Sequence, residues 1–440
     1  MDEQINTYNL KAVVMETGLK PVTLRAWERR YGLPEPKRTT GKHRLYSQRD
    51  IDMLKWLLAR QKEGVSISQA VTIWRNMEAD GQDPLVTASP VSGFTSASTL
   101  PEGIGEQLAD LRQAWMDACQ AFDESRVDQI LMQAFSRFPV EVVCLEVLQK
   151  GLAEIGMAWY EGNVTVQQEH FASAQAMRRL EMLVAAQPPA TRVERILVGC
   201  APKDTHAFSA LLLTFLLRRF GWDVVYLGAD VPTEQLVETI QATTPDLVIF
   251  TSQLLFTAVS LLTISKILEE HQIAFAFGGL AFVTMPMLAD HIAGFFLGPT
   301  LVDAPRQVQR IFARDLSPIV PPPADPVYQA ASLQYDQRRA AIEATIWNGL
   351  DEFGLPPYFL SEINGYFGRD ISAALKLGDI DLLESNLDWL LVLIDNHGWP
   401  RELLTLYLRA YNTAVQTHLP MVGHPLRLWL QQTLAGDIIS

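Results

Sequence analysis

Cysteine and long apolar runs are scarce in this 440-residue chain. The three cysteines, Cys119, Cys144 and Cys200, are far apart and odd in number, so they form neither a disulfide framework nor a zinc-ligand spacing. Such sparse use is typical of a reducing cytosol, and we expect a cytoplasmic protein. No stretch of about 18 apolar residues is free of charge, which excludes a membrane-spanning helix. The first four residues lack the basic and apolar regions of a signal peptide.

Positively charged residues are scarce outside the N-terminal region. The formal net charge is −14, which excludes a protein that coats nucleic acid along its whole length. Residues 1–75 nevertheless hold 14 Lys and Arg against 8 Asp and Glu, whereas the remaining residues hold 22 against 42. This asymmetry predicts an anion-binding module confined to the N-terminal region. Apolar residues make up 48% of the chain, enough to bury large cores in about three domains.

Changes in the hydrophobic pattern divide the chain into segments. We expect a basic head, a flexible linker, a helical bundle, an α/β domain, a proline-rich linker and a C-terminal helical domain, at residues 1–75, 76–104, 105–190, 191–318, 319–327 and 328–440. In the fourth segment, short apolar runs alternate with helical stretches, which predicts βαβ units and a parallel, Rossmann-like (flavodoxin-like) sheet. The expected strands are residues 196–200, 223–227, 247–252, 273–277 and 294–297. In the last segment, we expect helices at residues 336–353, 359–377, 380–396 and 402–418.

The basic head has the pattern of a helix-turn-helix over residues 14–27, with Gly18 in the turn and Pro21 at the start of the second helix. Polar side chains on the second helix can reach DNA: Thr23, Arg25, Arg29 and Arg30. Gly41 can then turn a short hairpin, a wing that carries Lys37, Arg38, Lys42, His43 and Arg44. Such charges neutralise phosphates, and a helix in the major groove reads base edges. A solvated basic surface is the alternative, but helix, turn and wing together favour DNA binding.

Residues 8–74 resemble the MerR family through "TGLKPVTLRAWERRYGL" and "GKHRLYSQRDIDMLKWL". The resemblance implies a winged helix-turn-helix that reads an inverted repeat in double-stranded DNA as a dimer or tetramer. It also implies DNA contacts at five positions: Arg25, Arg38, His43, Arg44 and Tyr46. MerR metal sensors carry cysteines after this domain, and this chain has none there, which argues against metal sensing of that kind.

A polar loop, residues 202–209, follows the first expected strand. Open α/β sheets bind ligands at the carboxyl ends of their strands. His206 can ligate a metal through one ring nitrogen while Asp204 accepts the other ring N–H and fixes the tautomer. Ser209 leaves room beside the next helix. Taken alone, the Asp-x-His pattern also fits a solvated or capping loop histidine.

This α/β region resembles the cobalamin-binding fold of methionine synthase and its relatives. The matching pieces are Asp204-Thr-His206-Ala-Phe-Ser209, then Ser252-Gln-Leu254, then Gly278-Gly279. The resemblance implies that His206 is the lower ligand of cobalt. It also implies that the displaced nucleotide tail of the cofactor lies beside Ser209, Ser252, Gly278 and Gly279. Ser209 stands where that family has glycine, which adds a hydroxymethyl group at a point of close backbone approach.

The spacing Trp159-x9-Glu169-His170 resembles the cap of the CarH/LitR group of light-sensing regulators. It implies that these three side chains cover the adenosyl ligand of adenosylcobalamin; the alternative is a core tryptophan and a surface pair. Tyr160 stands where the best-known members have a histidine that ligates cobalt after illumination. An upper ligand after light would therefore come from His170 or water.

The C-terminal segment is rich in aromatic residues at helical spacing, which favours a hydrophobic core over a cofactor pocket. A helical sensor or dimerisation domain is expected, with a second chromophore or small-molecule pocket as the other interpretation. The fold class is therefore multidomain α and α/β: a winged helix-turn-helix, a four-helix cap bundle, a Rossmann-like domain and an all-α domain.

Together these observations predict a cobalamin-dependent, light-responsive transcription repressor and not an enzyme. Adenosylcobalamin is the expected form of the cofactor, and methylcobalamin is the second form considered. Two alternatives stay open. The first is a MerR-type regulator that senses another ligand through its C-terminal helices, and the second is a corrinoid carrier or methyltransferase component.

Overall fold

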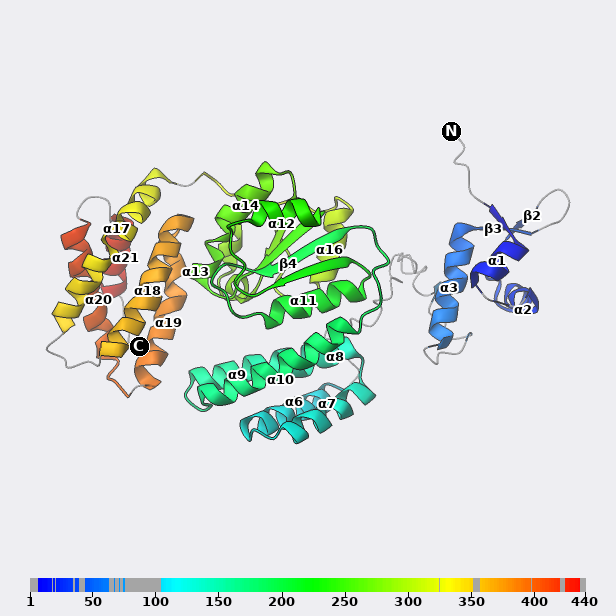
Figure 1. Cartoon of the computed structure of the whole chain (residues 1–440), viewed down its shortest axis with the longest axis horizontal. Coiled ribbons are helices and arrows are strands. Elements are labelled where there is room, and N and C mark those ends of the chain that lie inside the picture. The colour runs from blue at the N-terminus through cyan, green and yellow to red at the C-terminus, as the bar shows by residue number, and fades with distance from the viewer. Residues whose placement is uncertain are drawn as a thin grey trace. The chain divides into compact units, whose positions relative to one another are not determined.

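The computed structural model describes residues 7–17, 19, 21–34, 36–38, 44–62, 67, 71, 74–75, 104–323, 325–350, 357–396, 398–419 and 424–435. The chain forms two compact units, Met1–Phe94 and Thr95–Ser440, which are described separately (Figure 1). Gly18, Gly41 and the expected linker up to residue 103 lie outside the described residues.

The first unit is the basic head. Its elements in chain order are β1 (Thr7–Asn9), α1 (Leu10–Thr17), α2 (Pro21–Tyr31), β2 (Lys37–Arg38), β3 (Arg44–Ser47) and α3 (Gln48–Lys62). The strands form an antiparallel sheet in the order β1-β3-β2. Ser47 and Asp50 cap α3 reciprocally, because the Asp50 carboxylate accepts the Ser47 N–H at 2.7 Å and the Ser47 hydroxyl accepts the Asp50 N–H at 3.1 Å. The helix-turn-helix and the wing strands thus share one small core.

The second unit begins with a helical bundle. Its elements are α6 (Ile104–Gln120), α7 (Glu124–Arg137), α8 (Val140–Val143), the π-helical segment η2 (Cys144–Gln149), α9 (Lys150–Tyr160) and α10 (Val166–Ala185). Because α8, η2 and α9 follow one another without a break, the bundle has four helical rods, as expected. Trp115 is buried at its centre, and Gly151 faces the Trp115 ring where a Cβ would come within 2.8 Å of it. The bundle packs on the α/β domain through contacts between α10 and α11 (Phe208–Arg219).

The α/β domain follows with β4 (Arg195–Cys200), α11 (Phe208–Arg219), β5 (Asp223–Gly228), α12 (Leu236–Thr243), β6 (Leu247–Thr251), α13 (Leu255–Ala258), α14 (Leu261–Glu270), β7 (Ala274–Gly278), α15 (Leu280–Thr284), the 3₁₀ helix η3 (Pro286–His291), β8 (Phe295–Phe296) and α16 (Ala304–Phe312). The five strands are parallel, in the order β5-β4-β6-β7-β8. This is the flavodoxin-like order, which confirms the expected fold and places the topological switch point beside β4.

The helical stretch that follows the third strand is divided into α13 and α14. At the junction the Ser260 hydroxyl donates to the Thr257 carbonyl oxygen at 2.6 Å, a local bond that competes with helix continuation. The division separates a short helix that follows the third strand from the longer helix that covers the sheet.

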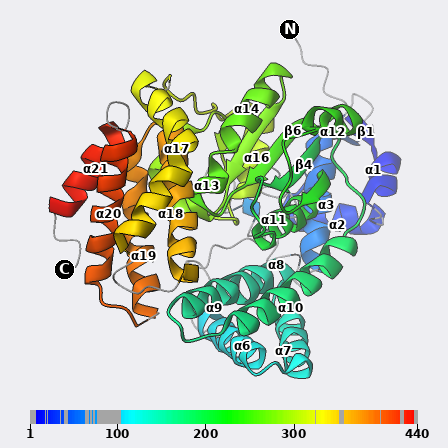
Figure 2. The same cartoon turned by 60° about the vertical axis from the view of Figure 1, so that its left-hand side comes forward.

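The C-terminal helices are α17 (Pro326–Leu350), α18 (Pro357–Leu377), the 3₁₀ turn η5 (Ile380–Leu383), α19 (Glu384–Asn396), α20 (Glu402–His418) and α21 (His424–Ala435). Two sequence expectations are corrected here. The first helix begins ten residues earlier than expected, because Pro326 occupies the first turn, where its missing N–H costs nothing. A further helix, α21, was not expected. The aromatic side chains of the C-terminal helices form a core that is continuous with the core of the sheet. Figures 1 and 2 both show α13 beside α18.

The three cysteines are buried and unpaired with one another, in agreement with the expected absence of a disulfide framework. Among the described residues, no helix has the length and apolar character needed to cross a membrane.

Candidate ligand site and nucleic-acid interface

The second helix of the head, α2, presents basic side chains to solvent. Arg25 and Arg29 are exposed and Thr23 is half-buried. Arg38 lies on β2 opposite Arg44 of β3. His43 lies outside the described residues. The described part of the head therefore offers exposed guanidinium groups on one helix, as phosphate and base recognition require.

Tyr46 is completely buried, which corrects its expected role as a direct DNA contact. Its hydroxyl donates to Glu28 Oε1 of α2 at 2.6 Å, and Arg44 Nε donates to Glu28 Oε2 at 2.8 Å. Burial and the Glu28 carboxylate raise the pKa of Tyr46, so its hydroxyl remains a donor at neutral pH. Tyr46 thus holds β3 against α2. Sequence spacing identified Tyr46 but cannot reveal burial, and it missed Glu28.

Replacing Tyr46 by phenylalanine is expected to lower the free energy of unfolding of the head by about 1.5–3 kcal/mol, the usual contribution of a hydrogen bond to a charged group. Hydrogen exchange of head peptides across a urea series measures this loss in the full chain. Tyr8→Phe is the control, because its ring is half-buried on the neighbouring strand and its hydroxyl has no partner among the described residues. An equal loss in both variants would contradict the assigned role of Tyr46.

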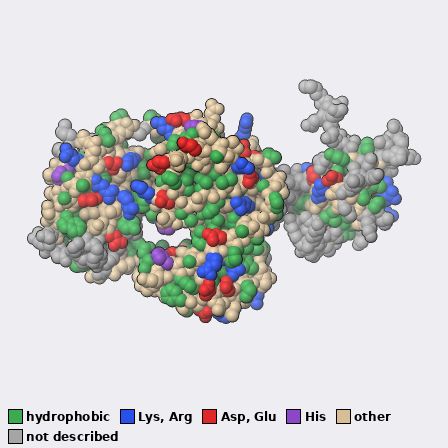
Figure 3. Space-filling view, viewed as in Figure 1, with side chains coloured by type: hydrophobic (Ala, Val, Ile, Leu, Met, Phe, Trp, Pro, Cys, Tyr) green, Lys and Arg blue, Asp and Glu red, His purple; other side chains and the backbone are tan. Residues whose placement is uncertain are grey.

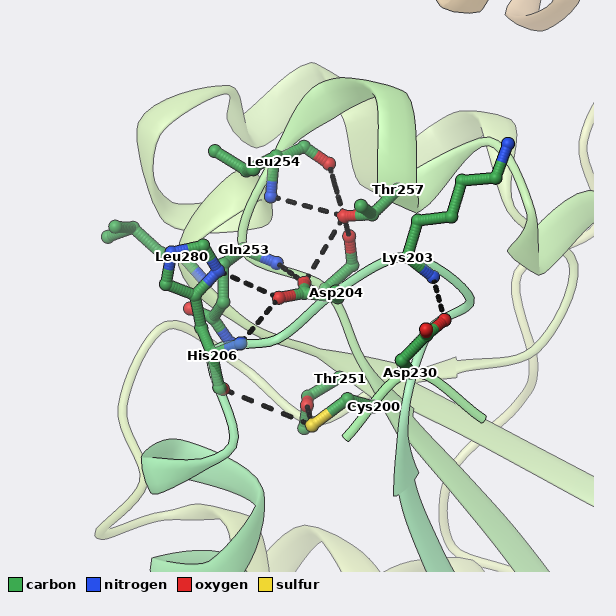
Figure 4. Close-up of polar contacts among 11 residues, drawn as sticks. Cys200, Lys203, Asp204, His206, Asp230, Thr251, Gln253, Leu254, Thr257 and Leu280 are labelled. Carbon is green, nitrogen blue, oxygen red and sulfur yellow. Dashed lines mark hydrogen bonds and ion pairs between the residues drawn. The ribbon is translucent and has the colours of Figure 1, made fainter. Parts of the chain in front are cut away.

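The loop after β4 carries a carboxylate–imidazole pair at the carboxyl edge of the sheet (Figure 4). Asp204 is 1% exposed, and its Oδ1 lies 2.9 Å from His206 Nδ1. The same oxygen accepts the backbone N–H of His206 at 3.1 Å. A carboxylate acceptor places the ring proton on Nδ1, so Nε2 carries the lone pair. Nε2 has no hydrogen-bond partner among the described residues, and the His206 side chain is 58% exposed.

The loop after β6 holds the second oxygen of Asp204. Gln253 N–H donates to Asp204 Oδ2 at 2.6 Å, and the Thr257 hydroxyl donates to it at 3.2 Å. Thr257 Oγ1 also lies 2.6 Å from Ser252 Oγ. The Ser252 hydroxyl is turned inward, donating to the Leu254 carbonyl oxygen at 3.1 Å. These bonds fix Asp204, and through it the ring of His206 (Figure 4).

The loop after β5 braces the same segment from the other side. Lys203 and Asp230 both have positive φ, at 66° and 46°. Asp230 Oδ1 accepts the Lys203 N–H at 2.5 Å, and Asp230 N–H donates to the Asp204 carbonyl oxygen at 2.9 Å. Sequence reasoning did not find Gln253, Thr257 or Asp230 as supporting residues. Nothing in the sequence around Asp230 shows which loop this residue holds.

Gly278 and Gly279 complete the edge of the sheet after β7. Gly279 has φ of +120°, and a Cβ there would lie 2.1 Å from the Ser252 carbonyl oxygen. A Cβ on Gly278 would meet only Leu297 Cβ, at 4.0 Å. Leu280 N–H donates to Gln253 Oε1 at 3.0 Å, while the Gln253 side-chain nitrogen is buried with no partner among the described residues. The glycine pair therefore brings two loop backbones together and leaves space beside Gly278.

Ser209 and Leu254 flank this edge. Ser209 is half-buried in the first turn of α11, and Leu254 is half-buried at the N-terminal end of α13. Neither side chain is confined to the core.

The cap residues lie at one end of the bundle. Trp159, in the last turn of α9, is 49% exposed. Glu169 Oε2 lies 2.7 Å from His170 Nδ1, and Glu169 Oε1 accepts the Ser173 hydroxyl at 2.6 Å. The His170 side chain is exposed, whereas the Glu169 side chain is half-buried.

Electrostatics connect the cap with the loop after β4. The hydrogen bond to Asp204 raises the pKa of His206 most, burial opposes it, and the charges of Asp204 and Glu169 add to the rise. Glu169 is therefore within electrostatic range of His206, although it lies on a different element. Figure 3 shows the second unit hollowed between the bundle and the sheet.

Exposed apolar side chains lie on both sides of this region. They comprise Met157 and Trp159 of α9, Leu280 and Val283 of α15, and Met287 of η3. No group of three or more His, Cys, Asp and Glu side chains suited to a metal ion occurs in the part of the chain that the structure describes.

Residues 8–76 match the model of the MerR HTH family regulatory proteins, and residues 111–183 and 194–300 each match a model of the B12 binding domain. The HTH-type transcriptional repressor CarH of Myxococcus xanthus is 31% identical over 242 residues, which are 55% of this chain and 77% of that protein. The repressor CarA of the same organism is 31% identical over 245 residues, 55% of this chain and 75% of that protein.

Among solved structures, the monomethylamine corrinoid protein of Methanosarcina barkeri aligns with 46% of this chain and 99% of that chain, at 17% identity and a TM-score of 0.40. Residues 301–440 lie outside the three matched family models.

Proposed function

The chain belongs to the family of MerR-type, cobalamin-binding transcription regulators that includes CarH and CarA, and we propose that it is a light-responsive repressor with adenosylcobalamin as its chromophore. The observation that supports this proposal most directly is the buried Asp204 carboxylate that holds His206 with its Nε2 directed away from the loop. The named relatives are transcriptional repressors, which favours a regulator over a corrinoid carrier enzyme.

The residues at the sheet edge fit a cobalamin. In its neutral form, His206 offers one preorganised ring nitrogen, as a lower axial ligand of cobalt requires. Gly278 leaves open space beside the loops, and the buried side-chain nitrogen of Gln253 has an unused donor there. A corrin ring supplies the remaining ligands of cobalt, which agrees with a site that offers a single imidazole.

Each residue of the site then has a defined role. His206 would hold cobalt from below, and Asp204 would keep its ring oriented. Space for the nucleotide tail is bordered by Ser209, Ser252, Leu254, Gly278 and Gly279. Trp159, Glu169 and His170 would cover the upper face. When bound, adenosylcobalamin supplies a cobalt–carbon bond that visible light breaks. Tyr160 cannot provide an imidazole, so His170 or water is left as the upper ligand.

Repression in this proposal acts through the head. Arg25, Arg29 and Arg38 would contact an inverted repeat, which needs two heads and hence a dimer or tetramer. We place the domain boundaries as the sequence suggests, with the head at residues 1–75, the cap bundle at 105–190, the cobalamin domain at 191–318 and the C-terminal domain at 328–440.

Absorption spectra of the full chain, purified in darkness with adenosylcobalamin, test the proposal. We expect a retained corrin spectrum that changes under green light, together with at least about a ten-fold loss of affinity for a duplex selected from random DNA by the dark protein, equal to roughly 1.4 kcal/mol. A parallel sample with methylcobalamin identifies the preferred form. Failure to retain either corrinoid overturns cobalamin sensing, whereas retention with DNA affinity unchanged by light overturns the light response alone.

A further inference from the structure

The C-terminal helices contact the candidate cobalamin site on two sides. On one side α18 packs against α13, whose Thr257 donates to Asp204, and on the other Asn396 reaches the end of the cap helix α9. The proposed function does not use these contacts. The role of the C-terminal helices inferred from them rests on the proposed function, because it requires cobalamin to bind at His206.

The first contact begins at α13. Thr257 of this helix donates to Asp204, which in turn holds His206. Thr257 is completely buried, so a shift of α13 would move the donor relative to the carboxylate. The helix has only four residues, and its position therefore depends on what packs against it.

The partner of α13 is α18. Arg369 of α18 lies with its guanidinium carbon 4.2 Å from the centre of the Phe256 ring, a cation–π contact next to Thr257. Arg369 is itself held, because its Nε donates to the Gly365 carbonyl oxygen at 2.8 Å. A second link joins His291 Nε2 to Asp379 Oδ2 at 3.3 Å. The C-terminal domain is thus seated on the lower-ligand side of the site.

The second contact lies at the cap. Asn396, the last residue of α19, donates through its side-chain nitrogen to the carbonyl oxygen of Tyr160. Tyr160 ends α9 and directly follows the cap residue Trp159. Gly162, with φ of +75°, passes beside the same asparagine, whose Oδ1 lies 3.5 Å from where a Cβ would stand. The bond satisfies a carbonyl at a helix C-terminus, where no intrahelical donor remains.

We propose that the C-terminal domain is a clasp that joins the cap to the lower-ligand loop and so retains cobalamin between them. The links act in series: Asn396 holds the cap end, the helical core carries the connection, and Arg369 on Phe256 anchors it to α13. Breaking either link loosens this connection between the cap and the loop, while the direct packing of α10 on α11 remains. A series connection has a testable consequence, because breaking both ends should do no more than breaking one.

Dark dissociation of adenosylcobalamin from the full chain tests the clasp in Asn396→Ala, Arg369→Ala and the double variant. We expect about a five-fold faster dissociation in each single variant, the usual effect of one hydrogen bond or cation–π contact. The double variant should match the faster single variant. Asn348→Ala and Arg338→Ala, both exposed on α17, are the matched controls and should behave as the wild type. Hydrogen exchange of residues 158–164 should also rise in Asn396→Ala.

The outcomes separate the clasp from the proposed function. A wild type that holds cobalamin while the single variants dissociate at its rate overturns the clasp alone. Rate increases that multiply in the double variant overturn the series connection and indicate two independent local effects. A wild type that retains no cobalamin overturns the proposed function, and with it the clasp, before any variant is compared.

Discussion

Replacing His206 by alanine is expected to weaken cobalamin retention at least about 100-fold and to change the absorption spectrum of what remains bound. Removing the hydrogen-bond partner of a metal ligand usually costs roughly 10–100-fold in affinity, and loss of the ligand itself exceeds that. Asp204→Asn should fall within the smaller range, because the amide can no longer accept with full charge from His206. Equilibrium dialysis in darkness measures both losses.

The control for this prediction is His271→Ala. His271 is exposed at the end of α14, where its Nδ1 lies 2.9 Å from the Ile267 carbonyl oxygen, away from the loops of the site. It should leave retention and spectrum unchanged. Wild-type retention in the His206 variant would remove this histidine from the site, and a loss in Asp204→Asn without one in His206→Ala would indicate a folding defect instead.

Replacing Gly279 by alanine is expected to lower the free energy of unfolding of the second unit by about 2–5 kcal/mol. Two costs combine: a side chain at φ of +120° is strained, and its Cβ would lie 2.1 Å from the Ser252 carbonyl oxygen, so the two loop backbones must separate. Because Ser252 N–H donates to the Gly278 carbonyl oxygen at 2.9 Å, that separation also breaks a bond between the loops.

Gly278→Ala is the matched control for stability, since it adds the same methyl group one residue earlier. Its Cβ has no neighbour closer than 4.0 Å, and its φ is not positive. We expect its unfolding free energy to stay within about 1 kcal/mol of the wild type. Urea denaturation of both variants, followed by circular dichroism, measures the two unfolding free energies. Equal values would show that the close approach of the loops after β6 and β7 does not require glycine at position 279.

Several features followed from local patterns alone. Apolar runs of five or six residues between helical stretches were sufficient for β4, β6 and β7, because strands buried on both faces consist of such runs. The pair Asp204 and His206 was also readable, since a two-residue spacing within one loop keeps the groups within reach of each other. The start of α17 could not be read from the sequence. Proline ends most helices, but it is tolerated in the first turn, where Pro326 lies.

Burial decided the role of Tyr46. Its position in the wing matched a DNA-contacting pattern, but the ring fills the core between β3 and α2, where its hydroxyl bonds to Glu28. The separation of 18 residues between donor and acceptor carries no periodic signal. Only the packing of a strand against a helix shows that the side chain supports the interface from within.

The order of the domains, the type of sheet and the pairing of Asp204 with His206 could be predicted from the sequence. Each of these features depends on residues that are close together in the chain. The tertiary structure alone decided what supports that pair and what adjoins it. Thr257 reaches Asp204 across 53 residues, and Asn396 reaches Tyr160 across 236. Such contacts depend on how separate elements pack, and a residue pattern within one element does not encode the neighbour it will meet.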